Sequence, residues 1–137
     1  MDSGRIARRL LFLLFLLACA LWLLLDDPAR AGLVLNEVLY DPEGADGDLE
    51  FVELIAAGAE SLVLADLQLE FCNGSAPGAW EPLWTGPIAL PPGGLFLIAE
   101  PAVPGADVHL TLDLQNGPEA IRLRAQGQVL DLLGYGE

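Results

Sequence analysis

Apolar and polar residues alternate within short segments along residues 33–133, and residues that favour turns separate these segments. Residues 67–71 (LQLEF) place three apolar side chains on one face and two polar side chains on the other. Residues 51–54 (FVEL) and 121–124 (IRLR) follow the same period of two. This pattern is typical of half-buried antiparallel strands. It predicts strands over Leu33–Tyr40, Phe51–Ile55, Ser61–Leu64, Leu67–Phe71, Gly94–Ala99, Ile121–Arg124 and Val129–Leu133.

The segments between the predicted strands are rich in Gly, Pro, Asn and Asp, the residues that turns favour. One reversal is predictable in detail: residues 121–124 and 129–133 form a hairpin in which Gly127 supplies a positive φ. Residues 77–86 (PGAWEPLWTG) are expected to form a loop, because proline and polar residues interrupt them. No segment beyond residue 31 keeps a helical period, so this part of the chain is predicted to be all-β, a sandwich or a barrel.

The N-terminal part follows a different pattern. Residues 10–25 are apolar without interruption; three arginines precede them and two aspartates follow. This order is typical of a signal peptide, and small residues around Arg30 offer a cleavage site that would leave Gly32 as the first residue. An uncleaved membrane anchor is the alternative, since the apolar run approaches the length that spans a bilayer. Because the flanking arginines lie on the N-terminal side, either reading places residues 32–137 outside the cytoplasm.

Without residues 1–31 the chain is strongly acidic. Only Arg122 and Arg124 oppose 17 acidic residues, which gives a formal charge of −15, and the chain contains no lysine. Such a surface repels nucleic-acid phosphates and anionic lipid headgroups, so we expect no direct nucleic-acid binding and membrane contact only through the N-terminal segment. Glu70, on the polar face of its predicted strand, is expected to lie in solvent, so that replacing it by Lys should change little.

The densest group of carboxylates follows the first predicted strand. Asp41, Glu43, Asp46 and Asp48 could converge on a calcium ion, which prefers several oxygen ligands. The spacing departs from an EF-hand loop, because Ala45 stands where a third ligand is needed. A solvated loop in an acidic protein is the competing interpretation.

Other candidates for chemistry are few. His109 is the one histidine in the sequence, and Cys72 is the one cysteine beyond residue 31. No serine-hydrolase, zinc-protease or nucleotide-binding motif accompanies them, so we expect no catalytic residues, no cofactor and no enzyme activity. Trp80 and Trp84 could form an aromatic rim for a protein or cell-surface partner, although one of them is expected to cap the core.

Several stretches together resemble the lamin tail domain family in its bacterial secreted form. They are LVLNEVLYDP, LEFVEL, LADLQLEFCNG, IALPPGGLFLIAE and LQNGPEAIRLRAQGQVLDLLGYG, which cover nearly all of residues 33–136 in the order of that family. The resemblance implies an immunoglobulin-like antiparallel β-sandwich, here preceded by one apolar N-terminal helix. The family has no associated catalytic residues.

The resemblance also implies a role. It favours a non-catalytic structural or protein-interaction module outside the cytoplasm, spanning residues 32–137. The alternative is an accessory domain of a secreted hydrolase, a nuclease or a peptidase, whose catalytic part is not in this chain. Members of the family usually continue past GYG, whereas this sequence ends at Glu137, so a closing edge strand is expected to be truncated.

Overall fold

The computed structural model describes residues 32–43 and 48–136 of the chain. The predicted signal peptide or anchor in residues 1–31, with its apolar helix, lies outside these residues. Nowhere in the described ranges does the chain form a helix of the length and apolarity that crossing a bilayer takes.

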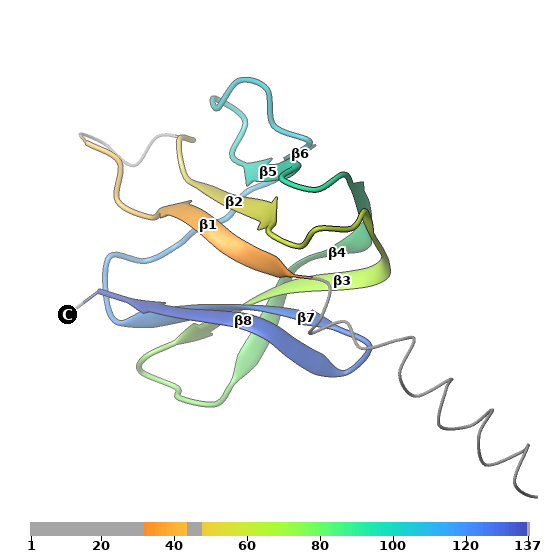
Figure 1. The fold of residues 1–137 in the computed structure, drawn as a ribbon. Coiled ribbons are helices and arrows are strands. Elements are labelled where there is room, and N and C mark those ends of the chain that lie inside the picture. Colours follow the sequence, from red (N-terminus) through yellow and green to blue (C-terminus); the bar gives the residue numbers. More distant parts are fainter. Residues whose placement is uncertain (1–31, 44–47, 137) are drawn as a thin grey trace, which may run out of the picture.

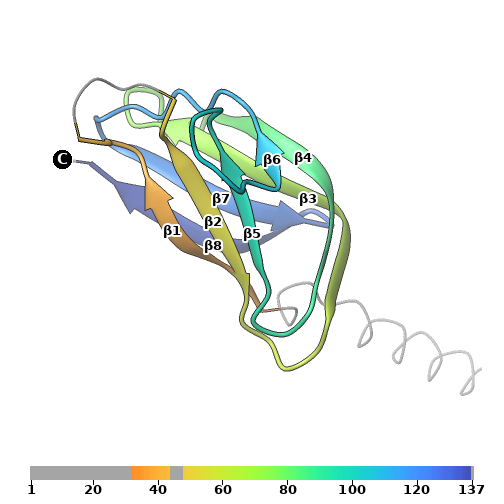
Figure 2. The same ribbon diagram turned by 90° about the horizontal axis from the view of Figure 1, so that it is seen from above.

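Strands make up the regular structure of the described residues, and they form two sheets that face each other (Figures 1 and 2). The strands are β1 (Leu33–Leu39), β2 (Phe51–Ala56), β3 (Leu62–Asn73), β4 (Trp80–Leu90), β5 (Leu95–Ala99), β6 (Val108–His109), β7 (Glu119–Ala125) and β8 (Gln128–Tyr135). One sheet has the order β1-β2-β5-β6 and the other β4-β3-β7-β8. Neighbouring strands are antiparallel except for β5 and β6, which are parallel.

This strand order is immunoglobulin-like. In the immunoglobulin fold, strands A, B and E share one sheet, and strands C, F and G share the other, with C′ added beside C in variable-type domains. Here β1, β2 and β5 occupy the positions of A, B and E, while β3, β4, β7 and β8 occupy those of C, C′, F and G. The predicted fold class, an all-β immunoglobulin-like sandwich, is confirmed.

The predicted alternation decides which side chains form the core. Val52 and Leu54 on β2 are fully buried and face Ile121 and Leu123 on β7, which are also fully buried. The residues between them in sequence point away from the core and are partly exposed. Each fully buried aliphatic side chain stabilises the fold by about 1.5–3 kcal/mol, so this layer is the main favourable contribution to folding.

The hairpin of β7 and β8 also agrees with its prediction. Gln126 and Gly127 connect the strands, with φ angles of 50° and 77°. Two consecutive positive φ angles define the two-residue hairpin turn whose twist matches that of the flanking strands. Gly127 therefore has the backbone role that the sequence indicates.

Two predictions about strands are wrong. Ser61–Leu64 and Leu67–Phe71, predicted as separate strands, belong to the single strand β3, because a bulge between Leu64 and Leu67 accommodates the break in alternation. Residues 77–86, predicted as a loop, contain the first half of β4. Prolines are compatible with β4 because it is an edge strand, which does not need every N–H for pairing.

The buried layer gives a direct test on one strand. Replacing Leu69, which is fully buried on β3, by Ala leaves a cavity and should lower the free energy of unfolding by about 2–5 kcal/mol. Val63 lies on the same strand but is 75% exposed, so Val63→Ala should change this free energy by less than about 0.5 kcal/mol. Urea denaturation of both variants measures the difference. Equal losses would show that the core face of β3 is misassigned.

Candidate interaction site

The predicted calcium ligands lie in the connection between β1 and β2. Asp41, Glu43 and Asp48 are exposed, and Asp48 has a φ of 57°. Asp46 lies outside the described residues. Among the residues that are described, no group of three or more His, Cys, Asp or Glu side chains is arranged to hold a metal ion. Calcium binding by the full set of four carboxylates stays a prediction.

The two tryptophans do not form one aromatic rim. Trp84 pairs with Leu69 and points into the sandwich, where its ring contacts Phe96 of the opposite sheet with 5.4 Å between ring centroids. Gly86 makes room for it, since a Cβ at that position would lie 2.5 Å from the Trp84 ring. Trp84 is therefore the tryptophan that packs against the core. Trp80 pairs with Cys72 near the other end of β4 and lies on the outer face of the sheet.

Trp80 belongs to a cluster around Glu70 on that outer face. Arg122 donates from Nε to Glu70 Oε2 at 2.5 Å, and its guanidinium lies 4.0 Å from the centroid of the Trp80 ring. Arg124 approaches the other Glu70 oxygen at 3.6 Å. Glu70 is buried as a result, so the expectation that it lies in solvent is wrong. The physical reason is cross-strand pairing: Gln68, Glu70, Arg122 and Arg124 share one face, and the long arginine side chains cover the carboxylate.

Three further buried carboxylates hold the chain outside the strands. Glu50 accepts a hydrogen bond from the Leu114 N–H at 2.8 Å. Glu100 accepts from the N–H groups of Leu112 and Glu50, at 3.4 and 3.3 Å. Both carboxylates thereby hold the segment between β6 and β7, whose Leu112 and Leu114 side chains enter the core. Sequence reasoning missed these roles, because an acidic residue at a strand end looks locally like a solvated one.

The third of these carboxylates, Glu119, binds a tyrosine at the same end of the sandwich. Its Oε2 accepts hydrogen bonds from the Tyr135 hydroxyl at 2.6 Å and from the Gln115 N–H at 3.2 Å. Its Oε1 is buried and has no hydrogen-bond partner in the described part of the chain. Tyr135 also stacks on Tyr40, with 4.2 Å between ring centroids. Burial, and then the negative Glu119 beside the hydroxyl, raise the pKa of Tyr135 far above its usual value.

His109 and Cys72 contact backbone carbonyls. The exposed His109 ring has Nδ1 3.2 Å from the carbonyl oxygen of Glu100. The buried Cys72 thiol lies 3.6 Å from the carbonyl oxygen of Ala76 and 3.8 Å from that of Asn73. These contacts fix loops and strand ends, and they do not form the nucleophile–base arrangement that covalent catalysis uses.

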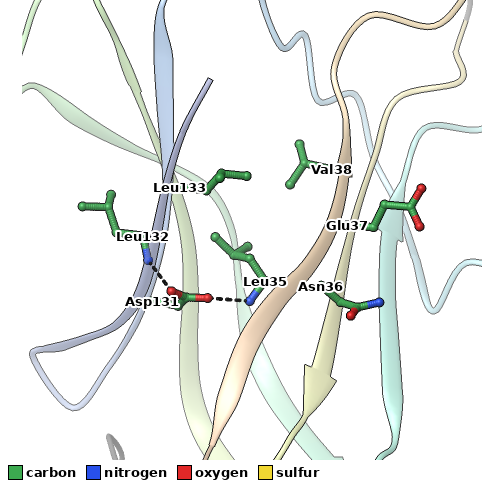
Figure 3. A pocket seen from close by; sticks show the side chains of 7 residues that line it. All are labelled: Leu35, Asn36, Glu37, Val38, Asp131, Leu132 and Leu133. Atoms are coloured by element: carbon green, nitrogen blue, oxygen red, sulfur yellow. Dashed lines mark hydrogen bonds between the residues drawn. The ribbon is translucent and has the colours of Figure 1, made fainter. Parts of the chain in front are cut away.

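A groove runs between β1 and β8, which are the edge strands of the two sheets on the same side of the molecule (Figure 3). Leu35 and Val38 from β1 and Leu133 from β8 point into it. Asp131 joins the two strands at one end of the groove: Oδ2 accepts from the Leu35 N–H at 2.8 Å and Oδ1 from the Leu132 N–H at 2.9 Å. Glu37 points away from the groove.

The groove is small and has both apolar and polar residues in its lining, the polar ones being Asn36, Glu37 and Asp131. Its volume is about 230 Å³. Pockets for drug-sized ligands usually hold about 300–1,000 Å³ and enclose most of the ligand. Of the β8 residues in its lining, Leu132 is 57% exposed and Leu133 is 39% exposed, on opposite faces of the strand. The groove is therefore smaller than the usual pocket for a drug-sized ligand.

No protein-family model matches the chain, and a search of curated proteins finds no match. Among solved structures, a β-glucosidase from Kluyveromyces marxianus is similar, with 10% sequence identity and a TM-score of 0.41. The match covers 76% of this chain and 13% of the β-glucosidase chain, so this chain spans a small part of that protein's length. A likeness at this TM-score carries no argument about function.

The Glu70 cluster generates a test of its role in stability. Replacing Glu70 by Lys places a third cation beside Arg122 and Arg124, and should lower the free energy of unfolding by about 3 kcal/mol. Glu81→Lys makes the same change of charge at an exposed position on β4 and should have little effect. Urea denaturation at neutral pH compares the two variants. If both behave like the unchanged chain, the ion pairs do not stabilise the fold.

Tyr135 generates a test by pH. A tyrosine in the unfolded chain ionises near pH 10, whereas burial and Glu119 keep folded Tyr135 protonated at that pH. The stability that Tyr135 contributes through this difference in pKa is therefore complete below about pH 10. It declines as the pH rises further, because only the unfolded state releases the proton. Tyr135→Phe should flatten the fall in unfolding free energy between about pH 9.5 and pH 11.

The measurement is urea denaturation of the unchanged chain and Tyr135→Phe across this pH range. The loss of the hydrogen bond to Glu119 lowers stability at every pH, so the slopes of unfolding free energy against pH are compared rather than the free energies themselves. The sequence contains no lysine, so few other groups titrate in the window. Identical slopes for the unchanged chain and Tyr135→Phe would show that Tyr135 does not cause the loss of stability at high pH.

Proposed function

We propose that this chain is a non-catalytic protein-interaction module of the lamin tail type that acts outside the cytoplasm. The observation that carries the proposal is the apolar surface of β8, where Leu132, Leu133 and Val129 are 57%, 39% and 47% exposed. Large apolar side chains gathered on one strand are costly to leave in water, and such surfaces mark interaction sites.

The placement of the carboxylates supports a non-catalytic role. Glu50 and Glu100 bind backbone N–H groups, Glu119 binds Tyr135, and Glu70 binds two arginines. A general acid or base needs a carboxyl group that can reach a substrate proton. These four groups are buried and serve the fold instead.

Charge and the N-terminal segment support the location and the class of partner. The formal charge of −15 beyond residue 31 disfavours nucleic acid and anionic membrane surfaces as partners, and leaves protein or another cell-surface component. The apolar run of residues 10–25 behind three arginines supports export or anchoring, with residues 32–137 on the far side of the membrane.

A crosslinking scan in the source cell tests the module hypothesis. A photo-crosslinking amino acid is placed singly at Leu132, Leu95, Val63 and Trp80, which sample different surfaces of the full-length chain. We expect at least one position to form a reproducible adduct with one extracytoplasmic protein. The purified pair should then bind with a dissociation constant in the micromolar range or tighter, measured by calorimetry.

Two results would contradict the proposal. One is the absence of an adduct at every position. The other is hydrolysis of a protein, polysaccharide or nucleic-acid substrate at a rate that Glu119→Gln abolishes, because this change keeps the shape of the side chain and removes its charge.

A further inference from the structure

The two sheets have four edge strands in the described part of the chain, and three of them are protected against pairing with another polypeptide. β6 consists of two residues. β4 contains Pro82 and Pro87, which have no N–H to offer. β1 has a bulge after Leu35, and the Leu35 N–H is occupied by Asp131. Short edges, prolines, bulges and inward-pointing charges are the devices by which proteins prevent edge-to-edge pairing.

In the C-terminal half of β8 the Asp131 carboxylate binds the Leu132 N–H, as it binds the Leu35 N–H on β1, and beyond Leu132 the strand has none of these devices. Its register with β7 is regular from Leu132 to Tyr135, without a bulge, a proline or a lysine. The Leu132 N–H donates to the Asp131 carboxylate, which lies between β8 and β1, so this N–H faces the free edge (Figure 3). Gly134 is two residues further along the strand, so its N–H and C=O face the same edge.

From the part of this edge beyond the Leu132 N–H we infer that β8 binds an extended, basic segment of a partner protein, which adds to the sheet as a further strand. This inference rests on the proposed interaction function and names the surface and the chemistry of the partner. The Leu132 C=O and the Gly134 N–H and C=O supply the hydrogen bonds, since the Leu132 N–H already donates to Asp131; in other complexes a peptide extends a sheet in the same way.

The side chains beside the edge define the apolar half of the partner's pattern. Alternate residues of an added strand point into the groove, where Leu35, Val38 and Leu133 contact them. The other residues of the added strand lie next to Leu132 on the outer face of the sheet. Burial of these leucines supplies the favourable free energy, and the volume of about 230 Å³ suits short aliphatic side chains.

The charges of the domain determine the basic half of the partner's residue pattern. Asp131 lies at one end of the groove, and Tyr40, which stacks on Tyr135 at the other end, is followed by the exposed Asp41 and Glu43. Two arginines in the domain, both bound to Glu70, are its only cations by sequence. A second copy of this chain would bring another formal charge of −15, whereas lysine or arginine at the ends of the added strand is attracted.

The test uses the full-length chain in a non-ionic detergent and a labelled, capped peptide of roughly six residues in which valine and lysine alternate. Fluorescence anisotropy measures its dissociation constant. Gly134→Pro removes an N–H that faces the free edge, and Leu132→Lys places a charge on the edge. Each should weaken binding at least about tenfold. Leu95→Lys is the matched control, since Leu95 is 51% exposed on the other sheet, and it should change binding less than about twofold.

Two measurements keep the result decisive. Urea denaturation shows whether each variant is folded. Because Gly134→Pro and Leu132→Lys are independent changes, one of them still tests the site when the other does not fold. Hydrogen exchange of the Gly134 amide should slow when the peptide binds. Equal affinity of the unchanged chain, Gly134→Pro and Leu132→Lys, or an unchanged Gly134 exchange rate at saturation, would overturn the inference.

The cellular partner separates this inference from the proposed function. If a partner found by crosslinking binds Gly134→Pro and Leu132→Lys as tightly as the unchanged chain, the β8 site is wrong and the interaction module stands. If the peptide binds β8 as expected but the crosslinking scan finds no partner, the edge chemistry is correct and the proposed function is wrong.

Discussion

The constraint on which this structure most depends is that backbone N–H groups away from water need acceptors where no neighbouring strand supplies them. Carboxylates supply them at several such places. Glu50 and Glu100 bind the segment that crosses from one sheet to the other, and Asp131 joins the edges of the two sheets by binding Leu35 and Leu132. These contacts let the chain leave a sheet while Leu112 and Leu114 still reach the core.

This use of carboxylates changes the meaning of the acidic composition. Charge counted along the sequence indicates a solvated surface, yet Glu50, Glu70, Glu100 and Glu119 are buried. Burying a carboxylate costs free energy unless hydrogen bonds or cations replace its water. Glu70 has two arginines, whereas Glu119 has Tyr135, Gln115 and one oxygen without a partner in the described residues. Removing a partner from Glu70 or Glu119 is therefore expected to lower the free energy of unfolding more than a change at an exposed carboxylate does.

Local alternation was sufficient to predict the strands that have one buried face. β2 and β7 were predicted within one or two residues, because their apolar positions follow a strict period of two. β4 was missed, because its prolines and the extra residue Leu83, opposite the register shift, obscure the alternation, and only its place at the edge makes this sequence compatible with a strand. A local pattern does not contain that information.

The candidate site was harder to predict than the fold for a related reason. Glu50 and its partner Leu114 are 64 residues apart, and Asp131 and Leu35 are 96 apart, so neither contact is visible in a window of sequence. The tryptophans illustrate the same limit. Trp80 and Trp84 are close in sequence and therefore looked like one surface, but one covers the core and the other lies against Arg122 on the outer face.

An exposed apolar edge would ordinarily invite pairing between copies of a protein, and the acidic charge provides a physical counterweight here. Two domains that each carry a formal charge of −15 repel one another over a distance of about 8 Å at physiological salt, which exceeds the spacing of neighbouring strands. The repulsion does not require a lysine, a proline or a bulge on β8. It acts on like charge only, so an edge that is closed to a second copy stays open to a basic strand. The acidic residues of the domain thereby favour the basic strand proposed to bind β8 over a second copy of the chain.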